Sequence, residues 1–159
     1  PNKQLTIIPA EDTMILDTAR TAGAFAPAGT SIDTEAARIT ILDTDATVWA
    51  SSLDDSPLTQ SPHILITHLT DLQNTEARFA EQERQTLLSW GKLPHLVRNG
   101  RAKVLIRSTR PGTPKAWALR TDGERLATLP VTKTAEGVEI ALAVKGQNGA
   151  QFIYELLWE

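Results

Sequence analysis

The stretch HILITHLTDLQNT, residues 63–75, is the longest strand-like run in the sequence. In an extended chain successive side chains point to opposite faces, so Ile64, Ile66 and His68 share one face and the residues between them share the other. Both faces are apolar in the first half of the run, as in strands covered by a second layer or a second domain. We therefore expect this run to form a central strand around which the rest of the chain is arranged.

Other short runs alternate apolar and polar residues and are separated by turn residues such as Asp122-Gly123, a pattern typical of all-β sandwiches and barrels. The clearest runs are residues 37–41, 102–106, 138–144 and 152–158. Residues 47–53 are predicted to pair with residues 37–41 as a hairpin, because the polar residues Asp43-Thr44-Asp45 lie between them.

Residues 76–85 are the one region that favours a helix. Their apolar residues are too few to form a buried stripe, so at most one short helix is expected near residues 76–85. The sequence thus predicts an all-β fold, an antiparallel two-sheet β-sandwich of jelly-roll or immunoglobulin-like type. A single domain is expected to span residues 1–159.

The composition is that of a globular protein, with a formal net charge of −3 and no cysteine. There is no block of Lys and Arg and no apolar run that could span a bilayer, so neither nucleic acid nor a membrane is expected as a partner. The chain begins at Pro1 and lacks a secretory signal pattern. We expect it to be a processed or excised piece of a larger protein.

Two groups of residues invite a metal-site interpretation. His63, His68 and Asp71 lie close in sequence, but residues three or five apart on a strand point to opposite faces. We instead expect His68 to be buried or interfacial and hydrogen-bonded to a neighbour. Asp43-x-Asp45 could contribute to a structural calcium site, yet it lacks the glycine and the distal glutamate of an EF-hand loop. No metal ligand and no cofactor is therefore predicted.

No motif for catalysis is present: the sequence has no nucleophile elbow, phosphate loop or dinucleotide fingerprint. A glycosidase needs two carboxylates at a fixed separation. The (β/α)₈ barrel that carries such pairs needs roughly 250 residues. We predict that this chain alone is not an enzyme, and no catalytic residue is nominated.

Several segments resemble, in the same order, the C-terminal accessory β-sandwich found behind the catalytic barrel of certain bacterial glycoside hydrolases of the cellulase-like and agarase-like kind. They are LDTARTAG at 16–23 (DTPRTQG in the family), SLDDSPL at 52–58 (SLDGKPL), ILIT at 64–67 with QNT at 73–75 (LLVT and QNTG), WGKLPHLV at 90–97 (WG..P.LV), and closing strands that include AWAL at 116–119, LPV at 129–131 and the aromatic-rich 152–158. The chain departs from the family at Ala19, Asp55 and Glu76, where the family often has Pro, Gly and Gly.

The resemblance implies a non-catalytic accessory domain whose partner is the catalytic domain of its own glycoside hydrolase, and it favours a secreted or periplasmic location. The accessory domain would pack on the catalytic barrel and support polysaccharide hydrolysis. The residues that we expect to form interdomain contacts are Ile64, Ile66, His68, Trp90 and Trp158. This hypothesis predicts that Trp90, Trp158 and the outer face of residues 64–69 are buried or form one apolar patch.

An alternative is a carbohydrate-binding module that grips polysaccharide with exposed aromatic rings, with Trp49, Trp117 and Tyr154 as the candidates. It requires at least two exposed, roughly coplanar rings on a concave face. A third hypothesis, a small enzyme of unrecognised type, requires a pocket with converging ionisable groups, and the sequence nominates none.

Overall fold

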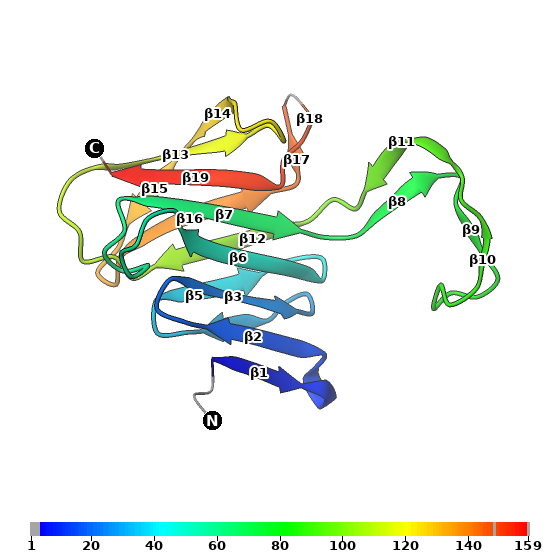
Figure 1. The fold of residues 1–159 in the computed structure, drawn as a ribbon, viewed down its shortest axis with the longest axis horizontal. Coiled ribbons are helices and arrows are strands. Elements are labelled where there is room, and N and C mark those ends of the chain that lie inside the picture. Colours follow the sequence, from blue (N-terminus) through cyan, green and yellow to red (C-terminus); the bar gives the residue numbers. More distant parts are fainter. Residues whose placement is uncertain (1–3, 148, 159) are drawn as a thin grey trace.

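The computed structural model describes residues 4–147 and 149–158 and has the predicted all-β architecture (Figure 1). Two antiparallel sheets pack against each other around one hydrophobic core. A pair of two-stranded ribbons extends away from this sandwich. The predicted fold class, an antiparallel β-sandwich, is confirmed.

The large sheet has eight strands in the order β1-β2-β3-β6-β7-β19-β13-β14. Their bounds are β1 Leu5–Ile8, β2 Thr13–Asp17, β3 Thr21–Ala26, β6 Ala46–Ser52, β7 His63–Leu69, β19 Ile153–Trp158, β13 Pro114–Leu119 and β14 Arg125–Leu129. A single 3-10 turn, η1 Pro9–Glu11, joins β1 to β2. No helix in the described part of the chain is long and apolar enough to cross a membrane.

The small sheet has five strands in the order β15-β16-β12-β5-β4. Their bounds are β15 Val131–Lys133, β16 Val138–Ala143, β12 Arg101–Ile106, β5 Ala37–Ile41 and β4 Ser31–Asp33. Three two-stranded ribbons complete the fold: β8 Leu72–Thr75 with β11 Lys92–Val97, β9 Arg78–Phe79 with β10 Leu87–Ser89, and β17 Lys145–Gly146 with β18 Gly149–Ala150.

Strand β7 lies in the middle of the large sheet, between β6 and β19, as expected for the most apolar run. Ile64, Ile66 and His68 face the core and are fully buried. On the opposite face Leu65 is half-buried and Leu69 is exposed. The small sheet covers the inner face. No described part of the chain buries the outer face, so the covering layer that the sequence predicts there is not found within the described residues.

The predicted hairpin between residues 37–41 and 47–53 is wrong. β5 pairs with β4 and β12 in the small sheet, whereas β6 pairs with β3 and β7 in the large sheet. The connection between β5 and β6 crosses from the small sheet to the large sheet. At its start, the backbone N–H of Leu42 still donates to the carbonyl of Arg101, beside β5. Both strands alternate buried and half-buried residues, so each can supply one side of the same core.

The prediction that His68 is hydrogen-bonded to a neighbour is also wrong. The side chain is fully buried, and neither ring nitrogen has a hydrogen-bond partner. Burial lowers the pKa of His68 to about 4, and the carboxylate of Asp43 offsets only part of this effect. His68 is therefore a neutral core residue.

Candidate functional site

Residues 70–99, called the arm here, leave the sandwich after β7 and return to it at β12 (Figure 1). The arm consists of the two ribbons β8–β11 and β9–β10. Residues 76–85, where a short helix was considered, form no helix and contain β9 and the tip of the arm instead. The arm lies outside the two packed sheets of the sandwich.

The arm contributes no buried residue, because every residue from 69 to 99 is either half-buried or exposed. The described chain has ten exposed large apolar side chains, and five of them lie on the arm: Leu72, Leu88, Trp90, Leu93 and Leu96. Trp90 is the most open of all, with 77% of its surface exposed. Such a concentration of exposed apolar side chains is typical of an interaction surface.

The arm bends sharply at two neighbouring positions. Glu76 and Gly91 both have positive φ, at 61° and 69°. A Cβ atom on Gly91 would collide with the backbone of Thr75 and Ala77, so only glycine fits where the returning chain crosses the outgoing one. As a result the far ribbon, β9–β10, turns relative to the near ribbon.

An ion pair ties the tip of the arm to its base. The Arg84 guanidinium donates to both carboxylate oxygens of Asp71, at 2.9 and 2.8 Å, and Arg98 donates to the same carboxylate at 2.9 Å. The hydrogen bonds from Arg84 hold the pKa of Asp71 below its usual range. The arm therefore curls back on itself into a hook.

The concave side of the hook forms a pocket of about 390 Å³, called the hook pocket here. Its lining residues are Leu72, Gln73, Asn74, Ala77, Phe79, Arg84, Leu87, Trp90 and His95. The exposed leucines Leu88, Leu93 and Leu96 do not line this pocket and are called the outer leucines. The arm thus offers two distinct apolar regions.

A chain of hydrogen bonds orients the polar groups of the hook pocket. The Asn74 side-chain amide donates to the carbonyl of Trp90 at 2.8 Å. Its carbonyl oxygen Oδ1 therefore faces His95 Nδ1, at 2.7 Å, and Nδ1 must carry the proton. In the neutral imidazole this leaves His95 Nε2 as a hydrogen-bond acceptor.

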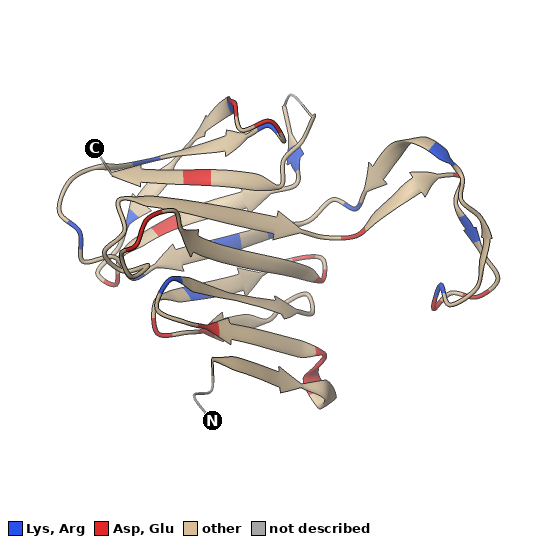
Figure 2. Ribbon diagram, in the orientation of Figure 1, with Lys and Arg blue, Asp and Glu red and all other residues tan. Residues whose placement is uncertain are grey.

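Charge on the arm is balanced. It carries four acidic residues, Asp71, Glu76, Glu81 and Glu83, and four basic residues, Arg78, Arg84, Lys92 and Arg98. Figure 2 shows both signs interspersed along the arm, and Lys92 pairs with Glu76 at 2.7 Å. A net-neutral arm with internal ion pairs is suited to an apolar partner rather than to a polyanion.

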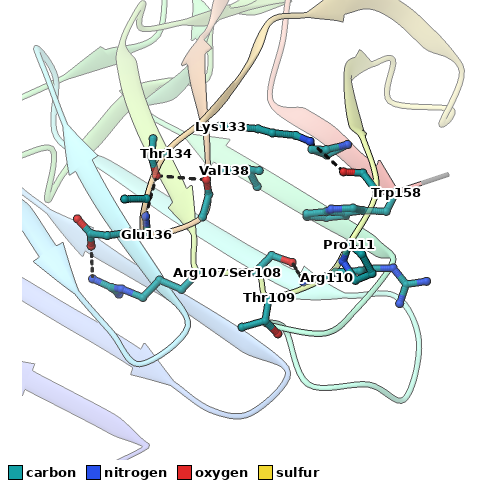
Figure 3. A pocket seen from close by; sticks show the side chains of 14 residues that line it. Arg107, Ser108, Thr109, Arg110, Pro111, Lys133, Thr134, Glu136, Val138 and Trp158 are labelled. Atoms are coloured by element: carbon teal, nitrogen blue, oxygen red, sulfur yellow. Dashed lines mark hydrogen bonds and ion pairs between the residues drawn. The ribbon is translucent and has the colours of Figure 1, made fainter.

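A second concave region lies at the opposite end of the sandwich, between the 107–112 loop, the 133–138 hairpin and Trp158 (Figure 3). This cleft has a volume of about 480 Å³. Two of its charged lining residues form ion pairs within the fold: Arg107 pairs with Asp33, and Glu136 accepts from Arg38 at 3.1 and 3.3 Å. Lys133 donates to the carbonyl of Gly112 at 3.0 Å. These contacts close the end of the sandwich.

The three carbohydrate candidates from the sequence do not form a platform. Tyr154 is fully buried. Its hydroxyl lies within hydrogen-bond distance of the carbonyl oxygens of Ala143 and Gln151, and burial raises the pKa of Tyr154 to about 12. Trp49 and Trp117 are half-buried on the outer face of the large sheet, with β7 and β19 between their strands.

The rings of Trp49 and Trp117 both contact residues of neighbouring strands in the large sheet. The ring of Trp49 lies against Gly23 on the neighbouring strand. The guanidinium of Arg125 lies 3.7 Å from the centre of the Trp117 ring. Arg125 in turn pairs with Glu155, which also binds His63 at 2.7 Å. These contacts give both rings a structural role.

Four of the five predicted interdomain residues lie inside the sandwich. Ile64, Ile66 and His68 are fully buried, and Trp158 is 6% exposed. This corrects their assignment as interdomain contacts, because the small sheet covers the inner face on which they lie. Trp90 is the one candidate that the structure leaves open, on the arm.

The residues considered for calcium have other partners. Asp43 accepts hydrogen bonds from the backbone and side chain of Arg101, and these lower its pKa. Asp45 accepts from the backbone N–H of Ala28. Within residues 4–147 and 149–158 no group of three or more His, Asp and Glu side chains is placed to hold a metal ion.

Sequence reasoning missed Asn74, Phe79 and His95 as site residues. One signal could have pointed to the segment that holds His95: residues 87–96 are rich in apolar side chains but follow no period that would put them on one face, whereas no local pattern marks Asn74 or Phe79. Such a segment does not fit the core of a sandwich and is therefore a candidate surface.

Comparison with protein-family models, with curated proteins and with solved structures found no match to this chain. The function is therefore inferred from the residues and their arrangement.

Proposed function

We propose that this chain is a non-catalytic accessory domain of a bacterial glycoside hydrolase, and that its arm docks on the catalytic domain and so supports polysaccharide hydrolysis. The observation that carries the proposal is the arm itself, which keeps five large apolar side chains exposed and buries none.

An exposed arm that buries no side chain is unusual in a domain that works alone. A two-stranded ribbon is marginally stable in water unless it packs on another surface. The outer leucines Leu88 and Leu93 are 63% and 71% exposed. Fully burying a leucine side chain contributes about 1.5–3 kcal/mol. A protein surface that covers the outer leucines would therefore stabilise both the arm and the complex.

The choice of partner rests on the family resemblance. Two of the resembling segments, residues 73–75 and 90–97, lie on the arm rather than in the core of the sandwich. Balanced charge on the arm favours an apolar protein surface over a polyanionic one. A catalytic barrel belonging to the same enzyme is the partner that the resemblance names.

The alternative, a carbohydrate-binding module built on Trp49, Trp117 and Tyr154, has less support. Tyr154 is buried, and the other two rings are half-buried: Arg125 lies over Trp117, and Trp49 rests against Gly23. A sugar ring could not stack on Tyr154 without opening the core.

Replacing two outer leucines, Leu88→Ser with Leu93→Ser, is expected to weaken binding to the catalytic domain by about tenfold or more, because each variant loses apolar area at the contact. The catalytic domain for this test is the one encoded in the same reading frame as the chain. Isothermal titration calorimetry of the two domains measures the affinity.

The matched control is Leu53→Ser, since Leu53 is 49% exposed but lies in a turn of the sandwich. It should leave the affinity unchanged. The proposal fails if the reading frame encodes no glycoside hydrolase domain, or if the double variant binds as tightly as the wild type.

A further inference from the structure

We propose that the hook pocket binds a neutral sugar ring of the polysaccharide, with Trp90 as the stacking surface and His95 and Gln73 as hydrogen-bonding groups. The inference goes beyond docking and rests on the proposed function for the class of substrate. It assigns a binding role to residues that differ from the three aromatic candidates nominated by the sequence.

The first step concerns shape and apolar character. The pocket volume of about 390 Å³ falls within the range of about 300–1,000 Å³ that is usual for small-ligand sites. Phe79, Leu87 and Leu72 line it together with Trp90. An indole that is 77% exposed beside such a pocket presents a flat apolar face, which matches the C–H face of a pyranose.

The second step concerns polar groups. The Asn74 amide is held by the Trp90 carbonyl and in turn fixes the imidazole of His95, so His95 Nε2 accepts a hydrogen bond in a set direction. The amide of Gln73 also lines the pocket. A few oriented polar groups on an otherwise apolar wall suit a ligand with one apolar face and several hydroxyls.

The third step concerns charge. No acidic residue lines the pocket, and both carboxylate oxygens of Asp71 already accept from its one permanent cation, Arg84. A charged ligand would find no uncompensated partner, and its desolvation would therefore oppose binding. The ligand is accordingly a neutral sugar rather than an acidic one.

The sugar site and the docking surface lie on different side chains of the arm. The outer leucines do not line the hook pocket, so a contact that covers them need not fill the pocket. The arm would then hold a polysaccharide strand beside the catalytic domain. This separation allows the two proposals to be tested independently.

The test titrates the wild-type chain with cellotetraose and agarotetraose as neutral probes and with an alginate oligosaccharide as an acidic probe, and follows tryptophan fluorescence and heat. We expect saturable binding of at least one neutral probe that is insensitive to added salt. Trp90→Ala should weaken it at least tenfold, and His95→Phe, which keeps a ring but removes the acceptor, about threefold to tenfold.

Crossed controls separate this proposal from docking. Leu88→Ser with Leu93→Ser should bind the neutral probe as the wild type does but bind the catalytic domain more weakly, whereas His95→Phe should bind the probe more weakly and the catalytic domain as the wild type does. Trp49→Ala reports any contribution from the outer face of the large sheet. Absence of binding to both neutral probes, tighter binding of alginate, or unchanged affinity in Trp90→Ala would each overturn the sugar site.

Discussion

Gly23→Val is expected to lower the free energy of unfolding by about 4 kcal/mol or more, the largest effect that we predict for a single substitution. Gly23 lies on β3 directly opposite Trp49 on β6. A Cβ atom at this position would collide with the Trp49 ring and with the backbone carbonyl of Val48, and would lie 2.8 Å from the Trp49 Cα atom. Two of these contacts are with backbone, so no side-chain rotation can relieve them.

Urea denaturation followed by circular dichroism measures this effect. Gly29→Ala is an informative control, because Gly29 has a φ of +80° but has nothing within 4 Å of an added Cβ. It tests backbone strain without crowding and should cost about 1–2 kcal/mol. Trp49→Ala added to Gly23→Val should recover part of the loss. A Gly23→Val protein as stable as the wild type would show that the ring does not rest on this glycine.

The second large effect is on pH dependence: the domain is expected to lose about 3 kcal/mol of stability from His68 as the pH falls from about 6.5 to about 4. The folded-state pKa of about 4 lies below the ordinary value of 6.5. Between these pH values His68 is protonated in the unfolded chain and neutral in the folded chain. The stability is therefore complete above pH 6.5 and is lost progressively toward pH 4.

His68→Leu isolates this contribution, because leucine has similar volume and needs no hydrogen bond. At pH 7 the variant should be at least as stable as the wild type, since His68 buries two unpartnered ring nitrogens. Between pH 7 and pH 4 it should lose about 3 kcal/mol less than the wild type. Urea midpoints across this range give the comparison.

His95→Gln is the control for this experiment, since His95 is exposed on the arm and plays no part in the core. The loss of stability that His68 causes between pH 7 and pH 4 should remain in this variant. Equal pH dependence in the wild type and in His68→Leu would mean that His68 is hydrated or protonated in the folded state, contrary to its complete burial.

The alternation of residue types was sufficient to predict the strands and their inner faces. In residues 63–69 the burial pattern follows the period of two, and β5, β6 and β16 repeat it. This works because the direction of each side chain in a strand is set locally by the pleat. The partition into core and surface was therefore open to sequence reasoning for the sandwich.

The candidate site was much less accessible. The hook pocket joins residues 72–79 to residues 84–95 through a bend at Gly91 and an ion pair between Asp71 and Arg84. No short-range sequence pattern predicts either contact, because the residues that meet lie more than ten positions apart in the sequence. Trp90 was singled out from sequence, but Asn74, which donates to the Trp90 carbonyl, and His95, which is hydrogen-bonded to Asn74, were not.

By itself, the sequence determined an all-β sandwich with a central strand that begins at residue 63, because apolar periodicity is a local property of an extended chain. The predicted run reached residue 75, but the strand ends at Leu69 and residues 72–75 form β8 on the arm. Only the tertiary structure decided that β5 and β6 belong to different sheets, that His68 lacks a partner, and that residues 70–99 leave the core as a curled arm. These features depend on which distant segments meet, and free energy from long-range packing rather than local preference selects them.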